Sequence, residues 1–237
     1  LHYNAPHSPW EGPEDGDLDH SHDVHAGPEG SPEKYGEMMK SMDDGIGRVL
    51  DALADTDQEQ TTLVVFTSDN GGARYSSNWP FSFQKGNCWE GGIRVPAIVR
   101  WPGVVPAGFQ TNQVATTMDW TATFLAASGT TPDTNYPLDG HNLLGICTGE
   151  SRAYDRTLYW RNSQHDAVRS GQWKYLGEQN GEHLFNLPAD PGEQNDLKDD
   201  FPAVFNTLRD QYQAWNSTMV PLPAGGQGGR GGRGRGR

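Results

Sequence analysis

Residues 61–72, TTLVVFTSDNGG, decide the fold class. The continuous run of Leu63 and the β-branched and aromatic residues up to Thr67 is typical of a buried strand, and such runs occur mainly in parallel sheets. The run ends abruptly in Asp69, Asn70 and two glycines, which indicates a loop at this point. We therefore expect a buried, parallel strand whose carboxyl end opens into a polar loop.

An amphipathic helix is predicted before this strand. Ser31 is a favourable N-cap, Pro32 fits a first helical turn, and Glu33 adds an early carboxylate. Apolar residues then recur at three- and four-residue spacing, namely Tyr35, Met38, Met39, Met42, Ile46, Val49, Leu50 and Leu53. Helix, buried strand and polar loop together indicate an α/β sheet, in which ligands gather at the carboxyl ends of strands.

The segment after the polar loop continues this pattern. A loop from 71 to 92 leads to a second expected strand between Ile93 and Val99, which ends before Pro102. Residues 118–127 fit a helix with Trp120, Phe124 and Leu125 on it.

The character of the sequence changes from about residue 132. DAVRSGQWKYL and EHLFNL predict short antiparallel strands, and PAVFNTLRDQYQAW predicts a helix with one apolar face. We therefore divide the chain into the larger α/β domain at 1–131, a smaller α+β subdomain at 132–223 and a disordered Gly/Arg-rich tail at 224–237.

The composition limits the classes of partner. The chain contains 18 Lys and Arg and 31 Asp and Glu, which gives a net charge of −13. This charge disfavours nonspecific binding to nucleic acid and to anionic membranes. An anionic substrate would therefore need a local positive site. No apolar run approaches the roughly 20 residues that cross a bilayer. The chain begins without Met, so we expect a fragment whose true start, with any export signal, is missing.

Three residues near the predicted strand end are candidates for a site. Asp69 and Asn70 offer a carboxylate and an amide oxygen, the hard ligands that Ca²⁺ or Mg²⁺ prefers. Lys85 lies in the glycine-flanked loop FQKGNCWEGGIRVP, where an ammonium can hold an anionic oxygen. The residue types alone also fit a plain turn for Asp69 and Asn70, and a solvated lysine at position 85.

Histidines form a second set of candidates. His7, in NAPHSPW, is bracketed by prolines that stiffen the backbone, and its imidazole can donate a proton near neutral pH, although a structural role is the simpler alternative. His20, His22 and His25 have irregular spacing without cysteine partners, which favours a solvated loop over a metal site.

Four segments occur in one order along the chain, namely APHSPW, SMDDGIGRVLDAL, TLVVFTSDNGG and NWPFSFQKGNCWEGGIRVPAIVRWPG. Their order and wording resemble the type I sulfatases, particularly the arylsulfatase B-like branch. ATTMDWTATFLAASG, PLDGHNLL, VRSGQWKYL and HLFNLPADPGEQNDL resemble later parts of that family. The resemblance covers about residues 1 to 216 and corresponds to the carboxyl-terminal portion of a sulfatase.

The resemblance implies an alkaline-phosphatase-like α/β fold and a sulfuric ester hydrolase. It assigns Asp69 and Asn70 to Ca²⁺, with Mg²⁺ as the second choice, and Lys85 to a sulfate oxygen and the leaving oxygen. It assigns His7 to sulfate contact and protonation of the leaving group. The implied substrate is a sulfate ester, with sulfated carbohydrates among the candidates. The implied compartment is secreted, periplasmic or lysosomal.

The family's nucleophile is a formylglycine, which a formylglycine-generating enzyme makes from a Cys/Ser-x-Pro-x-Arg motif that this chain lacks. Neither Cys88 nor Cys147 has the flanking residues to replace it, although the two can pair in an oxidising compartment. We therefore expect negligible activity from the isolated chain. We also expect it to be poorly soluble, because strands that lack their neighbours would expose apolar edges.

Two other readings stay open at this point. A phosphoester hydrolase of the alkaline-phosphatase superfamily needs the same cation-rich pocket for an anion. A truncated, non-catalytic sulfatase acting as a binding module, with its Arg-Gly tail contacting RNA, is the non-enzymatic alternative.

Overall fold

The computed structural model describes residues 1–16 and 30–222, and their contacts divide into two compact units. Unit 1 comprises Leu1–Asp69, Ala73–Ser77 and Pro96–Ala153, and unit 2 comprises Asn70–Gly72, Asn78–Val95 and the chain from Tyr154 onward. His20, His22, His25 and the tail at 224–237 lie outside the described residues. The domain boundaries expected from the sequence stay predictions.

The predicted long helix of unit 1 is confirmed. Helix α1 (Pro32–Asp55) starts with Pro32 in its first turn, and the Ser31 side chain accepts a hydrogen bond from the Lys34 amide at 3.1 Å. A 3₁₀ turn, η1 (Glu59–Thr61), leads to strand β1 (Val64–Thr67). None of the helices in the described residues is long and apolar enough to cross a membrane.

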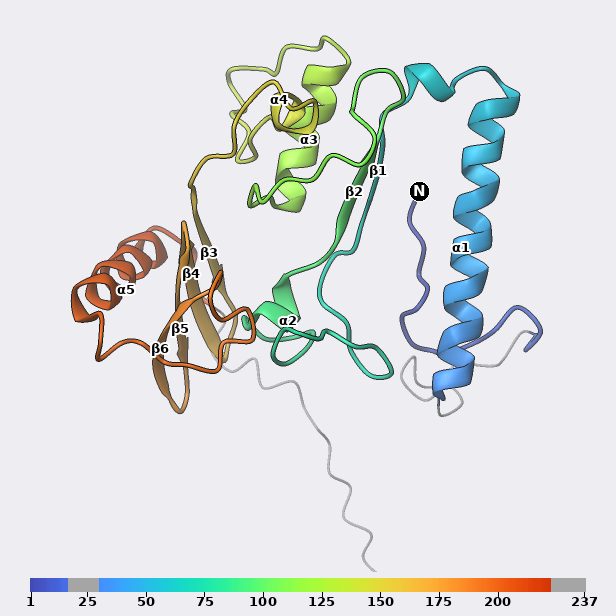
Figure 1. The fold of residues 1–237 in the computed structure, drawn as a ribbon. Coiled ribbons are helices and arrows are strands. Elements are labelled where there is room, and N and C mark those ends of the chain that lie inside the picture. Colours follow the sequence, from blue (N-terminus) through green and yellow to red (C-terminus); the bar gives the residue numbers. More distant parts are fainter. Residues whose placement is uncertain (17–29, 223–237) are drawn as a thin grey trace, which may run out of the picture. The chain divides into compact units, whose positions relative to one another are not determined.

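The expectation of a buried, parallel strand at 63–67 is wrong. β1 pairs antiparallel with β2 (Ala97–Arg100) in a two-stranded sheet (Figure 1). Phe66 lies opposite Ile98 in this pairing. The Phe66 side chain is 37% exposed and that of Ile98 is 60% exposed. Within the described residues β1 has a single neighbouring strand, so its apolar run stays partly open to solvent, as expected for an apolar strand edge.

The second expected strand is shorter than the pattern of apolar residues suggests. Residues Glu90–Ile93 form a helical turn, α2, and β2 starts only at Ala97. Pro96 lacks the N–H that a strand would donate, and the Arg94 amide instead donates to the Glu90 carbonyl at 2.7 Å.

The expected helix at 118–127 is confirmed as α3 (Thr117–Ala127). Thr116 and Asp119 form a capping box at its start. The buried Asp119 also accepts a hydrogen bond from the His141 amide at 2.8 Å, and this bond ties α3 to the loop before α4 (Leu144–Cys147).

Unit 2 contains a four-stranded antiparallel sheet in the order β3-β4-β5-β6 (Figure 1). Its strands are β3 (Thr157–Arg161), β4 (His165–Ser170), β5 (Trp173–Glu178) and β6 (Gly181–Asn186). The last three confirm the predicted strands, whereas β3 was not predicted. The predicted helix that follows is α5 (Pro202–Ser217), and it packs against the sheet.

The two faces of this sheet pack against different segments, because successive side chains of a strand point to opposite faces. On one face α5 contributes Leu208 and Tyr212 to a cluster with three sheet residues, Val168, Tyr175 and Leu184. On the other face Cys88 and Trp89 pack on the neighbouring sheet residues, Ala167, Leu176 and Phe185. The segment that carries Lys85 is therefore part of the core of unit 2.

A buried ion cluster fixes the same segment to the sheet. Lys174 of β5 has no exposed side-chain surface, and its Nζ lies 2.9 Å from Glu90 Oε1 and 2.7 Å from Glu193 Oε1. Glu193 Oε2 in turn accepts the Glu90 amide hydrogen at 2.6 Å. Burial raises the pKa of the Glu193 carboxyl, against the lowering effect of the Lys174 charge. The Lys174 ammonium and the Glu90 and Glu193 carboxylates thus hold α2 against β5.

Replacing Lys174 with Met should destabilise unit 2 strongly. Met retains much of the volume but leaves Glu193 buried without a cation, and it removes the nearest cation of Glu90, which keeps only Arg94 and Arg169 at 3.5 and 3.8 Å. We therefore expect a loss of about 3–5 kcal/mol in the free energy of unfolding at pH 7. Urea unfolding at several pH values measures it. The loss should shrink as the pH falls toward the ordinary glutamate pKa, because the stranded carboxyls of the folded variant then take up protons more readily than the unfolded chain.

Lys40→Met is the matched control. The Lys40 ammonium pairs with Asp44 on α1 at 2.6 Å, but its side chain is 75% exposed. We expect a change within about 0.5 kcal/mol, since solvent screens such pairs. Equal losses in the two variants would show that the Lys174 cluster adds nothing beyond a surface pair.

Candidate active site

Asp69 and Asn70 follow the carboxyl end of β1, as expected. The strand ends at Thr67, whose hydroxyl donates to the Pro96 carbonyl at 3.0 Å and so anchors this end of the pair of strands. The Asp69 side chain is exposed and Asn70 is half-buried. The two oxygen-bearing side chains thus lie in a loop directly after a strand that is held at its end.

The two glycines after Asn70 dock against the segment that carries Lys85. The Gly71 amide donates to the Gly92 carbonyl at 2.9 Å, and the Lys85 amide donates to the Gly72 carbonyl at 3.0 Å. All these residues belong to unit 2. The structure therefore brings the backbone after Asn70 next to the backbone of Lys85.

Asn78 is a functional candidate that the sequence analysis missed. Its Oδ1 accepts the Gly72 amide hydrogen at 2.8 Å, while its Nδ2 donates to the Gly72 carbonyl at 3.0 Å and to the Phe83 carbonyl at 3.1 Å. Asn78 thereby closes the loop 78–85 onto Gly72. The sequence signal was an Asn at the start of the loop, ahead of Trp-Pro, but its partners could not be inferred from it.

Lys85 presents an uncompensated positive charge. Its side chain is exposed, and no carboxylate among residues 1–16 and 30–222 forms an ion pair with its ammonium. The backbone of Lys85 is fixed while its charge faces solvent. This arrangement suits a cation that holds an anionic oxygen.

His7 lies in unit 1, in a turn where its amide donates to the Asn4 carbonyl at 2.7 Å. The imidazole is exposed, and its Nδ1 lies 2.6 Å from the Ser8 carbonyl oxygen. With Nδ1 as the donor in that contact, Nε2 is the ring atom left for a ligand. The segment is tied to the residues after Gly72 through Trp10, whose ring centroid lies 5.2 Å from that of Tyr75.

The donor set around Asp69 fits calcium in kind but supplies only part of a coordination shell. Calcium takes about six to eight oxygen ligands. Across residues 1–16 and 30–222 no group of three or more histidine, cysteine, aspartate or glutamate side chains is arranged to hold a metal ion. Asp69 and Asn70 can therefore contribute oxygens to a site that needs further ligands.

Both cysteines are free thiols. Burial raises the pKa of the Cys88 thiol to about 11 and also raises the pKa of the Cys147 thiol. Neither is a thiolate near neutral pH, so neither has the character of an activated nucleophile.

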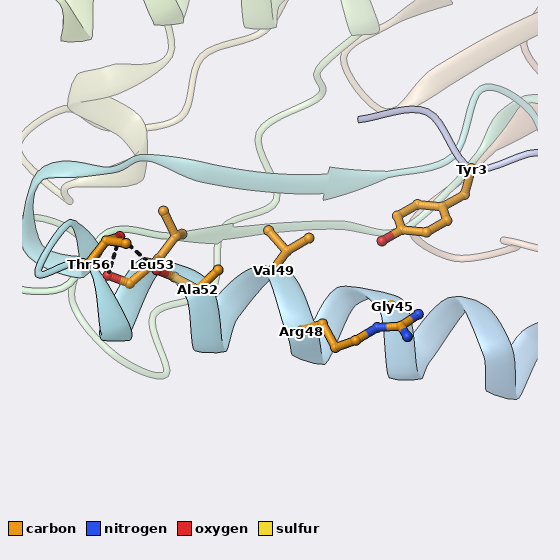
Figure 2. Close-up of a pocket in the computed structure, with 7 residues that line it drawn as sticks. All are labelled: Tyr3, Gly45, Arg48, Val49, Ala52, Leu53 and Thr56. Atoms are coloured by element: carbon orange, nitrogen blue, oxygen red, sulfur yellow. Dashed lines mark hydrogen bonds between the residues drawn. The ribbon is translucent and has the colours of Figure 1, made fainter.

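The groove along α1 is separate from these candidates. It has a volume of about 490 Å³ and lies within unit 1 (Figure 2). Its lining residues are Tyr3, Gly45, Arg48, Val49, Ala52, Leu53 and Thr56. The lining contains no carboxylate for a metal and none of the candidate site residues.

Gly71→Ala should separate the loop after Asn70 from the Lys85 segment. A Cβ on Gly71 would lie 1.9 Å from the Gly91 carbonyl oxygen, a backbone atom that cannot rotate away. We expect a loss of about 1–3 kcal/mol in the free energy of unfolding, as for other overpacked sites. Hydrogen exchange of the Lys85 amide should become faster, because its bond to Gly72 opens.

Gly36→Ala serves as the control for this change. Gly36 lies inside α1 and a Cβ there meets nothing within 4 Å. We expect it to stabilise the chain by about 0.5–1 kcal/mol, since alanine favours the helix. Unchanged Lys85 exchange in Gly71→Ala would contradict the docking described above.

Comparison with known proteins gives matches over most of the chain. The family model "Sulfatase" matches residues 1–130, and "N-sulphoglucosamine sulphohydrolase, C-terminal" matches residues 79–217. N-acetylgalactosamine-6-sulfatase of Homo sapiens is 40% identical over 148 residues, which are 60% of this chain and 28% of that protein. Arylsulfatase H of Homo sapiens is 28% identical over 238 residues, covering 80% of this chain and 42% of that protein.

Solved structures agree on the fold. The crystal structure of Ps i-CgsB superimposes with a TM-score of 0.77 and 30% identity, covering 90% of this chain and 48% of that one. The PsFucS1 sulfatase from Pseudoalteromonas sp. has a TM-score of 0.67 and 24% identity, covering 80% of this chain and 43% of that one. These matches confirm the predicted α/β sulfatase fold.

The chain spans 28% to 42% of the length of the two curated relatives described above. Because the Sulfatase family model matches more than half of its 237 residues, the chain belongs to the sulfatase family.

Proposed function

We propose that this chain forms part of a sulfuric ester hydrolase. The observation that carries the proposal is the unpaired ammonium of Lys85, whose amide donates a hydrogen bond to the carbonyl of Gly72, two residues after Asn70. A carboxylate, an amide oxygen and a cation on a fixed backbone suit the binding of an anionic ester together with a divalent ion. Membership of the sulfatase family supports sulfate esters as the substrate class.

Each candidate residue has a distinct role in this proposal. Asp69 and Asn70 contribute oxygen ligands to Ca²⁺, with Mg²⁺ as the second choice. When bound, the ion polarises the ester. Lys85 binds a sulfate oxygen and stabilises charge on the leaving oxygen. His7 contacts the sulfate and gives a proton to the leaving group through its imidazole.

The nucleophile of the proposed reaction is a formylglycine outside these 237 residues. The chain contains no Cys/Ser-x-Pro-x-Arg motif, and the raised pKa of the Cys88 thiol argues against a substitute. A formylglycine-generating enzyme is therefore a partner of the proposed complete protein. We expect negligible turnover by the chain alone, because losing a covalent nucleophile removes many orders of magnitude in rate.

Sulfated carbohydrates are the proposed substrates within this class. Ps i-CgsB, which is 31% identical to this chain, has been crystallised in complex with k-i-k-neocarrahexaose. A secreted, periplasmic or lysosomal compartment is the location that we propose, because of the family resemblance.

The test is hydrolysis by the chain extended upstream to include a formylglycine motif and coexpressed with a formylglycine-generating enzyme. We expect calcium-dependent sulfate release from an aryl sulfate. Asp69→Ala and Lys85→Ala should each lower kcat/KM by about 100-fold or more. Lys40→Ala, a matched exposed lysine on α1, should leave kcat/KM unchanged.

A phosphate monoester assayed in parallel distinguishes the competing hydrolase. Turnover of the phosphate ester without sulfate release, from folded protein that carries formylglycine, would replace the proposal with a phosphoester hydrolase. Absence of both activities would point to a non-catalytic binding role.

A further inference from the structure

Arg74 lies in an aromatic cluster that none of the roles above uses. Its guanidinium carbon is 4.9 Å from the Tyr75 ring centroid and 5.6 Å from the Trp10 ring centroid. The two rings meet edge to face, with centroids 5.2 Å apart and planes at 76°. All three residues belong to unit 1. We call Trp10, Arg74 and Tyr75 the Arg74 cluster.

The rings of the Arg74 cluster are held in place by the backbone. The Tyr75 hydroxyl donates a hydrogen bond to the Gly30 carbonyl oxygen. A Cβ on Gly30 would lie 2.4 Å from the Trp10 ring, so the indole rests directly on this glycine. Tyr75 itself has φ of 71°, a left-handed conformation that costs free energy for a residue with a side chain. Such strain persists where the surroundings hold a residue in place.

The charge of Arg74 is not neutralised within the described chain. Its side chain is exposed, and none of the carboxylates in residues 1–16 and 30–222 forms an ion pair with it. The protein as a whole carries a net charge of −13, so carboxylates are abundant. A guanidinium that lies over two rings keeps edge N–H groups free for oxygen ligands, in the planar arrangement that matches sulfate or carboxylate.

The position of the Arg74 cluster in the chain relates it to the candidate active site. Trp10 is three residues after His7, and Arg74 is five residues after Asp69. The contact between Trp10 and Tyr75 therefore joins the two segments of unit 1 that carry these candidates. A ligand held by the cluster would lie against both segments.

We propose that the Arg74 cluster is a saccharide subsite that binds a second anionic group, a sulfate or a carboxylate, of a sulfated carbohydrate. The guanidinium supplies two parallel N–H donors to the anion, and the aromatic rings offer apolar surface to the sugar. This inference rests on the proposed function for its substrate class. It assigns to Arg74 a contact with a sugar other than the one whose ester is cleaved.

Binding to the 237-residue chain tests the subsite without any need for the nucleophile. A sulfated dextran oligosaccharide is titrated into the chain, and the indole N–H resonance of Trp10, assigned with Trp10→Phe, is followed by NMR. This local signal separates the subsite from the four arginines at 224–237. Neutral dextran of the same length and sodium sulfate at the same ionic strength are the comparison ligands.

We expect saturable shifts of the Trp10 resonance with the sulfated oligosaccharide, and none with neutral dextran. Sodium sulfate should give affinity at least tenfold weaker, because it lacks the sugar. Arg74→Met should raise the Kd about tenfold, and Arg74→Lys should give an intermediate Kd because it keeps the charge but loses the planar donors. Arg152→Met removes another exposed, unpaired arginine of unit 1 and should leave the Kd unchanged.

The subsite is overturned by equal shifts with neutral dextran, by equal affinity in Arg74→Met, or by the absence of any shift. Unfolding curves of Arg74→Met show whether the variant is folded, and Arg74→Lys gives a second variant with a smaller structural change. If the complete protein releases no sulfate while the Trp10 shift depends on Arg74, the proposed hydrolase fails and the anion subsite stands. Sulfate release without that shift removes the subsite alone.

Discussion

The contact between Lys174 and its two glutamates is the constraint on which unit 2 depends. An ammonium with no exposed surface is stable as an ion only when carboxylates surround it, and Glu90 and Glu193 come from segments far apart in the sequence. One of these carboxylates starts α2, directly after the core residues Cys88 and Trp89. The Lys174 charge on β5 therefore fixes the position of the loop at 78–95 on the sheet more specifically than apolar packing alone would.

This anchoring explains how an exposed lysine can be fixed in place. Lys85 is three residues before Cys88, and its own amide is bonded to Gly72. The loop is thus fastened on one side to the sheet and on the other to the glycines after Asn70. The Lys85 side chain can therefore change conformation only by rotation about its own side-chain bonds. Charged groups on a fixed backbone lose less entropy when they bind an anion than groups on a mobile loop.

Local sequence patterns predicted most of the helices and strands. They did not predict which distant segments pair with one another. Ser31 and Pro32 located the start of α1, and the two-residue period located β4 to β6. The partner of β1 depends on which segment reaches its edge, and no local pattern contains this information, so the parallel expectation was wrong. The burial of Lys174 and Glu90 could not be predicted from the sequence for the same reason, because they become buried together only when the loop folds onto the sheet.

For the candidate site, too, the sequence identified the residues but not how they are arranged in space. From the sequence alone, the glycines after Asn70 fit a plain turn, but the structure shows that Gly71 is needed for close backbone contact with Gly91. The Trp10 and Arg74 pair could not be found by spacing, since 64 positions separate the two residues in the sequence. In an acidic protein most cations are neutralised by neighbouring carboxylates, as Lys34 and Lys40 are. The cations that stay unpaired near candidate residues are therefore the more informative ones, because unpaired charge is what an anionic substrate can use.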